Sequence, residues 1–217
     1  MKWLKMQTVI WLFVFPMISH AQISKTINSP ADTTNTNAIP IEDIPIISLQ
    51  TIIELDKLKE SIITEDQIEA EKAKSDSILF HINRLLVNEE KVNFDSLLSR
   101  ELVNKSNFWI GYKEVLENQV SITENIIYEL SSKRKYVIKE LKLWVNTKSL
   151  IDSINMDSVY SGTINEVILQ ADSLDRVILA RTKISFSVLK RIKQHYVRVD
   201  DLLLEIKNIN RLRQEKI

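Results

Sequence analysis

Apolar residues recur at every seventh position through the middle of the chain. Seven members of this heptad series are apolar and one is threonine: Leu102, Trp109, Leu116, Thr123, Leu130, Val137, Trp144 and Ile151. A strict seven-residue repeat lines up on one stripe of an α-helix, and the stripe packs against a neighbouring helix with a left-handed supercoil. The pattern predicts one helix of ~85 Å from Asp95, a good N-cap residue, to Ile151.

Two further amphipathic segments flank this helix. The earlier one predicts a helix from about Ser48 to about Glu90, with an apolar stripe near each end: Leu49, Ile52, Ile53, Leu55, Leu58 and Ile62, then Ile78, Leu79, Ile82, Leu85 and Leu86. Between the stripes, residues 64–77 are mostly polar. Thr64 and Gln67 have the spacing of a capping box, so a helix could restart there, but we favour a continuous, solvated helical stretch.

The later segment follows an interruption at residues 152–157 (DSINMD). Its apolar residues fall on one helical face: Ile164, Val167, Ala171, Leu174 and Ile178, then Leu189, Ile192, Tyr196, Val199, Leu203 and Ile206. Such a helix needs the other two to cover its stripe. We therefore predict an all-α fold, in which long antiparallel, coiled-coil-like helices form an elongated two- to three-helix bundle over residues 47–217.

The amino-acid composition agrees with long helices and excludes every site that depends on cysteine. The chain has two glycines, and no proline follows Pro45, whereas a β-sheet protein of this length needs many turns that recruit both residues. Cysteine is absent, which excludes disulfides, thiol nucleophiles, cysteine metal sites and a lipid-modified cysteine.

The first 46 residues differ from the rest. Residues 1–21 predict a signal peptide, because two lysines precede the apolar run 8–17 and Ser19-His20-Ala21 offers a cleavage site before Gln22. An uncleaved anchor is the alternative, but the run is well short of the ~20 residues that a span needs. Residues 22–46 predict a disordered linker, in which the more apolar stretch 39–46 could dock in extended form. We expect an exported, periplasmic protein, associated with the inner membrane in one interpretation.

Charge is balanced overall but unevenly spread. Residues 42–76 hold ten acidic and four basic residues, whereas residues 176–217 hold eleven basic and four acidic residues. The basic residues of the third helix are Arg176, Arg181, Lys183, Lys190, Arg191, Lys193 and Arg198. They could contact anionic lipid headgroups, but we favour a solvated face or neutralisation by the acidic first helix. A zero net charge gives no indication of a nucleic-acid partner.

No set of residues predicts a reaction. His81 and His195 lack metal-ligand spacing, and we expect both at a helix surface. The pairs Glu89-Glu90 and Asp200-Asp201 diverge by about 100° on a helix, so we expect solvated faces. Gly111 lies inside the heptad helix without a phosphate-cradling loop. We predict no catalytic, cofactor-binding or metal-ligating residue, no cofactor and no small-molecule substrate, and hence no enzyme. Partners would be proteins, or further copies of the chain, that pack on the helical seams.

Several short segments add a family resemblance. In order along the chain they are 109–116 (WIGYKEVL), 140–147 (ELKLWVNT), 171–174 (ADSL), Arg181, 199–206 (VDDLLLEI) and Arg211. This order resembles the N-terminal periplasmic region of large MscS-like (small-conductance-type) mechanosensitive channels of Bacteroidota-type bacteria. The resemblance implies a Trp-x-x-Thr element that closes one long helix, and a second long helix that leads towards a membrane domain.

The departures from that family limit what the resemblance implies. The break after Thr147 lacks the proline that the family often has, and the membrane helices, the pore helix and the cytoplasmic vestibule have no counterpart. The resemblance then implies a truncated product or a stand-alone copy of the extension, unable to conduct ions alone. A free periplasmic coiled-coil adaptor or chaperone-like protein that binds envelope proteins is the alternative.

Overall fold

The computed structural model describes residues 38–154 and 158–215. Predictions for the signal peptide and for most of the linker lie outside these residues. The elements are a 3-10 turn η1 (Ile41–Asp43), the helices α1 (Ile44–Ser61) and α2 (Glu65–Glu89), a second 3-10 turn η2 (Phe94–Ser96), and the long helices α3 (Ser99–Ser153) and α4 (Ser158–Gln214). The described residues contain no strand, which confirms the all-α prediction.

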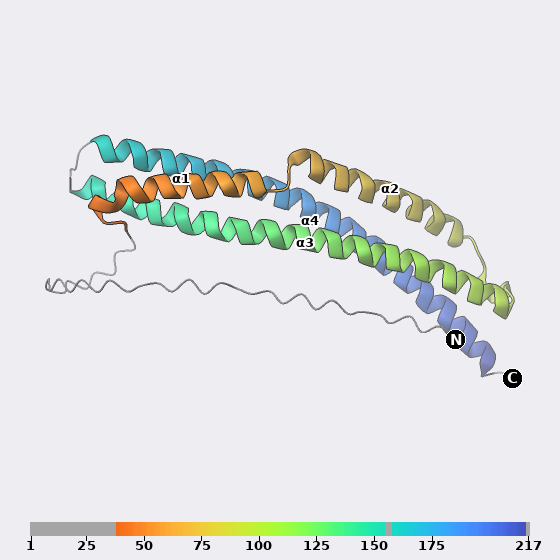
Figure 1. Ribbon diagram of the computed structural model, residues 1–217. Helices are drawn as coiled ribbons and strands as arrows, with labels where there is room; N and C mark the ends of the chain where they lie inside the picture. Colours follow the sequence, from red (N-terminus) through yellow and green to blue (C-terminus); the bar gives the residue numbers. More distant parts are fainter. Residues whose placement is uncertain (1–37, 155–157, 216–217) are drawn as a thin grey trace, which may run out of the picture. The chain divides into compact units, whose positions relative to one another are not determined.

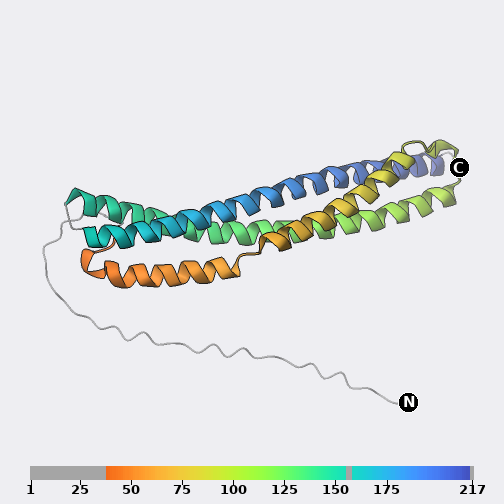
Figure 2. The ribbon, with the colours of Figure 1, turned by 90° about the horizontal axis from the view of Figure 1, so that it is seen from above.

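The helices form a bundle with three positions in cross-section. Helices α3 and α4 are antiparallel neighbours along their length, and α1 and α2 follow one another end to end beside them (Figures 1 and 2). Because α1 and α2 run parallel to α4, the chain passes up, down and up again. The third position is therefore shared, with α1 covering one end of the α3–α4 pair and α2 the other.

The heptad series forms the spine of the core. All eight of its residues are buried, including the two tryptophans, which are fully buried. The α4 stripe is also internal: Ile164, Val167, Ala171, Ile178, Ile192 and Val199 have no exposed surface. The seven-residue repeat was therefore a correct prediction of the face that α3 turns towards its neighbours.

The buried apolar residues fall into two groups, one at each end of the bundle. We call the first the α1-end core: Ile39, Ile44, Leu55, Ile62, Ile68, Leu130, Val137, Trp144, Ile151, Ile164, Val167, Ala171, Leu174 and Ile178. We call the second the α2-end core: Leu79, Ile82, Leu86, Phe94, Leu102, Trp109, Leu116, Val188, Ile192, Val199 and Ile206. Each core thus contains one of the two buried tryptophans.

The continuous helix predicted from Ser48 to Glu90 is wrong. Residues 62–64 separate α1 from α2, and Ile62 has extended backbone angles. The helix restarts with the capping box that its sequence allowed: the Gln67 backbone N–H donates to Thr64 Oγ1 at 3.3 Å, and the Thr64 N–H donates to Gln67 Oε1 at 2.9 Å. Local capping bonds and burial of Ile62 together favour the break over a solvated helix.

The helical domain also begins earlier than predicted, inside the proposed linker. Residues 41–46 are helical rather than extended, and Ile39 and Ile44 are buried in the α1-end core. Pro45 lies in the first turn of α1, where its missing N–H costs no hydrogen bond. Two members of the predicted first stripe, Leu49 and Ile53, are exposed instead, because α1 buries the face that carries Ile44, Ser48, Thr51 and Leu55.

The start of α3 differs by a few residues from the prediction. Asp95 lies in η2 and does not cap α3, which begins at Ser99. The Leu98 backbone N–H instead donates to the Glu101 carboxylate at 2.7 Å. Phe94 is buried, and the Arg213 guanidinium of α4 donates to the carbonyl oxygens of Phe94 and Asp95 at 3.3 and 2.6 Å. These contacts hold the η2 turn against the end of α4, and α3 starts beyond it.

Candidate interaction groove

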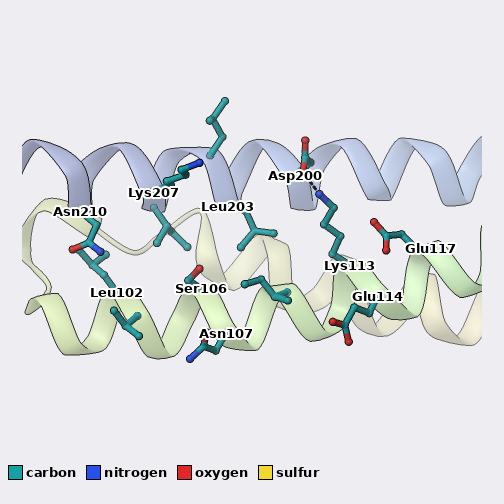
Figure 3. Close-up of a pocket in the computed structure, with 14 residues that line it drawn as sticks. Leu102, Ser106, Asn107, Lys113, Glu114, Glu117, Asp200, Leu203, Lys207 and Asn210 are labelled. Carbon is teal, nitrogen blue, oxygen red and sulfur yellow. Dashed lines mark hydrogen bonds and ion pairs between the residues drawn. The ribbon is translucent and has the colours of Figure 1, made fainter.

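An open groove lies between α3 and α4 at the end of the bundle that α2 covers. It encloses about 590 Å³, and its floor includes the core residues Leu102 and Ile206 together with Leu203 (Figure 3). Three apolar side chains at its edges are largely exposed: Val103 at 46%, Ile110 at 43% and Leu204 at 56%. The helix pair therefore presents apolar side chains here, among polar ones, that the bundle itself does not cover.

Polar contacts define one end of this groove. Lys113 Nζ lies 2.5 Å from Asp200 Oδ1 and 5.2 Å from the centre of the Tyr196 ring, and the Tyr196 hydroxyl donates to Glu117 at 3.0 Å. The hydrogen bond to Asp200, and then the one to Tyr196, raise the pKa of Lys113. This ammonium group stays charged at neutral pH, so the contacts fix the register of α3 against α4 and supply no proton donor for a reaction.

Towards its other end the groove has uncharged polar side chains on α3, followed by Leu102 and Val103. Ser106 and Asn107 extend from α3, and Lys207 and Asn210 from α4 (Figure 3). Apolar and hydrogen-bonding side chains thus alternate along the groove, and such a surface suits an amphipathic helix that lies along it. Sequence analysis did not identify Val103, Ile110 and Leu204, because each falls outside the heptad stripe and looks like an isolated surface residue.

A second groove lies between α1 and α4, with a volume of about 790 Å³. Its lining includes Leu169 and Val177, which are 68% and 38% exposed, and the buried residues Leu55 and Leu174. Gln170 Oε1 is buried at this groove without a hydrogen-bond partner among the described residues. Both grooves are therefore bounded by α4, one on its α3 side and one on its α1 side.

One cluster of titratable groups joins α1 to α3. The Tyr136 hydroxyl donates to the Glu54 carboxylate, and burial followed by this hydrogen bond raises the pKa of Tyr136. Burial also raises the pKa of Glu140; Lys139 opposes this shift and Glu54 adds to it. Since Glu54 and Tyr136 are 82 residues apart, no local pattern could have indicated the contact. Tyr136 therefore stays protonated, and its hydrogen bond to Glu54 links α3 to α1.

The residues considered for chemistry in the sequence do not come together. His81 is exposed and lies 2.9 Å from the Tyr112 hydroxyl, and His195 bonds the Arg191 carbonyl within its own helix. The prediction of a solvated Glu89 is wrong, because Glu89 is buried and paired with Lys105. Glu90 diverges from it and remains exposed.

The seven basic residues of α4 named in the sequence analysis divide into three sets. Three arginines point towards the first part of the chain: Arg181 donates to the Ile63 carbonyl at 2.6 Å, Arg191 pairs with Asp76 at 2.5 Å, and Arg198 pairs with Glu90 at 3.0 Å. Arg176 pairs with Asp172 on its own helix, and Lys193 with Glu124 on α3. Lys183 and Lys190 are exposed on the remaining face.

Within residues 38–154 and 158–215, no three His, Asp or Glu side chains are placed to hold a metal ion. In the same part of the chain, none of the helices combines the length and apolar character needed to cross a bilayer. Searches against protein-family models, curated proteins and solved structures find no match to this chain.

Proposed function

We propose that the protein is a non-enzymatic, exported helical module that packs on itself or on partner subunits beside the inner membrane, in the manner of the extension of a mechanosensitive channel. The groove between α3 and α4 carries this proposal. Its apolar floor and its exposed edges at Val103, Ile110 and Leu204 form a surface of the kind that a further helix covers.

Some residues of the segments that suggested the channel family lie at packing positions. Trp144 and Thr147 are fully buried, and so is Ala171, while Leu174 is nearly so. The family resemblance therefore rests in part on residues with a role in this bundle, and it supports a structural function for the module. The membrane-adjacent position follows from the resemblance and from the predicted signal peptide.

The packing role is tested by a charge placed in the groove. Ile110→Glu should abolish self-association or subunit binding, measured by sedimentation velocity and by co-purification from the cell envelope. Ile53→Glu is the matched control, because Ile53 is 44% exposed, close to the 43% of Ile110, and does not line the groove. Equal association of the wild type and both variants would contradict the proposal.

Disulfide cross-linking gives a second, independent readout. The chain has no cysteine, so Ile110→Cys and Ile53→Cys each introduce a unique thiol. Where the grooves of two copies face each other, the thiol of Ile110→Cys should form a disulfide with the same thiol of the second copy in an oxidising envelope, and Ile53→Cys should not. The absence of cross-linking from both positions would argue against packing through the groove.

Export has its own test. The intact mass of protein recovered from the envelope should correspond to a chain that starts at Gln22, as the Ser19-His20-Ala21 site predicts. A retained Met1 would refute the signal peptide.

A free periplasmic adaptor is the second candidate, and the groove between α1 and α4 favours it, because two open apolar grooves could hold two client segments. The genomic sequence after the codon for Ile217 separates the candidates. Membrane-spanning segments encoded there would favour the channel extension, and an unrelated neighbouring gene would favour the adaptor.

A further inference from the structure

The two apolar cores are separate along the bundle. In α3 the α2-end core ends at Leu116 and the α1-end core begins at Leu130; in α4 the corresponding limits are Val188 and Ile178. No residue belongs to both cores as defined above. The stretch between them still holds apolar residues: Ile127 is buried there, and Ile126 and Ile184 pack against the α1-end core.

Buried polar residues share this stretch. Five of the nine buried polar residues among those described lie there, and we call them the polar layer: Ser75, Gln119, Thr123, Thr182 and Ser185. They come from α2, α3 and α4, so the layer crosses the whole bundle. Small polar side chains bury little apolar area, and a layer of them holds helices together less strongly than leucine or isoleucine would.

The hydrogen bonds of the layer stay mostly within single helices. The hydroxyl groups donate to a backbone carbonyl of their own helix, Thr123 to Gln119 at 2.8 Å, Thr182 to Ile178 at 2.7 Å and Ser185 to Arg181 at 3.1 Å. Bonds of this kind, to the residue four positions earlier, weaken and bend helices. Both long helices therefore carry bend-promoting contacts in the same part of the bundle. The Ser75 hydroxyl differs, because it donates across helices to Gln119 Oε1 at 3.3 Å.

The third position of the bundle is interrupted close to the layer. The break at residues 62–64 separates α1 from α2 near the middle of α3 and α4 (Figure 2). Arg181 links the break to the layer, because its guanidinium donates to the Ile63 carbonyl at 2.6 Å and its own carbonyl accepts the Ser185 hydroxyl. Helix α2 itself runs unbroken through Ser75 and contributes Ile68 to the α1-end core, so a bend at the layer would bend α2 together with α3 and α4.

We propose that the polar layer is a hinge, at which the α1-end and α2-end cores move as two rigid bodies. This inference goes beyond the proposed packing function and does not depend on it. The competing explanation is that the polar layer fixes the register of the helices, as single polar residues do in coiled coils. The two explanations differ in what happens when the layer is made apolar.

Hydrogen exchange on the unmodified chain is the first test. In a uniform long helix the central amides are the best protected and the ends fray. A hinge predicts the reverse, with amides 119–127 of α3 and 178–189 of α4 exchanging about 10-fold faster than those of the two cores on either side. Protection that is uniform, or highest, through these segments would overturn the proposal.

Distance measurement between spin labels is the second test. Because the chain has no cysteine, Asn104→Cys and Lys139→Cys label α3 on both sides of the layer at exposed positions, ~52 Å apart along a straight helix. The hinge predicts a broad distance distribution. Thr123→Val with Thr182→Val keeps the side-chain shapes, removes two back-bonded hydroxyls and should narrow the distribution, with the exchange difference reduced as well.

The matched control is Thr147→Val, since Thr147 is also buried and bonds the Leu143 carbonyl of its own helix but lies within the α1-end core. This variant should leave the width of the distribution unchanged. If the double variant shifts the mean distance or the oligomeric state without narrowing the distribution, the layer sets register and the hinge is refuted. A narrow distribution in the labelled wild type would refute it as well.

Discussion

Thr147 Oγ1, on α3, accepts a hydrogen bond of 3.0 Å from the backbone N–H of Ile39, 108 residues earlier in the chain. The Thr147 hydroxyl also donates to the Leu143 carbonyl at 2.9 Å, so its acceptor lone pair is directed towards Ile39. Both residues are buried. This contact secures the segment that precedes α1 against α3.

Thr147→Val should destabilise the protein by about 1–3 kcal/mol, since it leaves the buried Ile39 N–H without an acceptor. The loss should concentrate at residues 38–44, where hydrogen exchange would rise more than in α3. Thr147→Ser keeps the hydroxyl and serves as the control. A valine variant with unchanged exchange at Ile39 would show that the bond contributes nothing to the attachment of this segment.

Trp144→Ala should cost about 3–5 kcal/mol, because the ring is fully buried in the α1-end core. The Trp144 Nε1–H has no hydrogen-bond partner among the described residues. Trp144→Phe should therefore cost less than the alanine variant, because it also removes a buried, unpaired donor. Thermal unfolding followed by circular dichroism measures both. A melting temperature for Trp144→Ala within a degree or two of wild type would place the ring outside the core.

Gly111→Ala and Gly162→Ala should each stabilise the protein by about 0.5–1 kcal/mol. Both glycines lie inside long helices, and a Cβ added at either position meets nothing within 4 Å. Alanine then gains helix propensity without a steric cost. Urea unfolding curves would show the midpoint rising at a constant slope. A decrease in stability would mean that the added methyl group meets a steric conflict, and it would contradict the prediction.

Glu140→Gln should stabilise the protein at neutral pH and lose this advantage in acid. Burial is the main cause that raises the pKa of Glu140 above its ordinary 4.5. The folded state therefore holds the proton more tightly than the unfolded chain does, so stability falls as pH rises from about 4 through the folded-state pKa. Melting temperatures of the two proteins should differ at pH 7 and converge below about pH 4. Glu114→Gln, which replaces an exposed carboxylate on the same helix, is the control for the loss of one negative charge.

The intact protein should not bind anionic vesicles at physiological salt, because Arg191 is already paired with Asp76 on α2 and Arg198 with Glu90, the residue after α2. Asp76→Asn with Glu90→Gln frees both arginines and should create binding that weakens as salt rises, at about 1 kcal/mol per basic side chain. Vesicle co-sedimentation measures it, with neutral vesicles as the control. Salt-sensitive binding by the wild type would show that the α4 surface meets lipid despite these pairs.

Periodicity was sufficient to predict the long helices, as α3 shows. The series from Leu102 to Ile151 is buried at every position, including the lone polar member Thr123. The prediction succeeds because a strict seven-residue apolar spacing over many turns keeps the same stripe of one helix facing its neighbour. The helix was predicted to end at Ile151, and α3 ends two residues later, at Ser153; residues 155–157 of the predicted interruption lie outside the described residues.

The helix break, the start of the helical domain and the groove could not be predicted, because each depends on contacts between residues far apart in the chain. The capping box at Thr64 was visible in the sequence, but its advantage over a continuous helix depends on burial of Ile62 by α4, which no local pattern reveals. The order of residues 39–46 depends in the same way on Thr147, far away in the chain. The groove residues Ile110 and Leu204 were missed because an exposed apolar side chain is ordinary until its neighbour on another helix is known.

Helices α1 and α2 pack mainly against α4, which is the last helix of the chain to be synthesised. Asp76 must wait for Arg191, 115 residues later, and Arg198 is just as distant from Asn83. By contrast, α3 and α4 can pair progressively from the turn near Ile154 as soon as both exist. The apolar faces of α1 and α2 thus stay uncovered until most of α4 has been synthesised. During that interval the nascent chain would most need a holding chaperone.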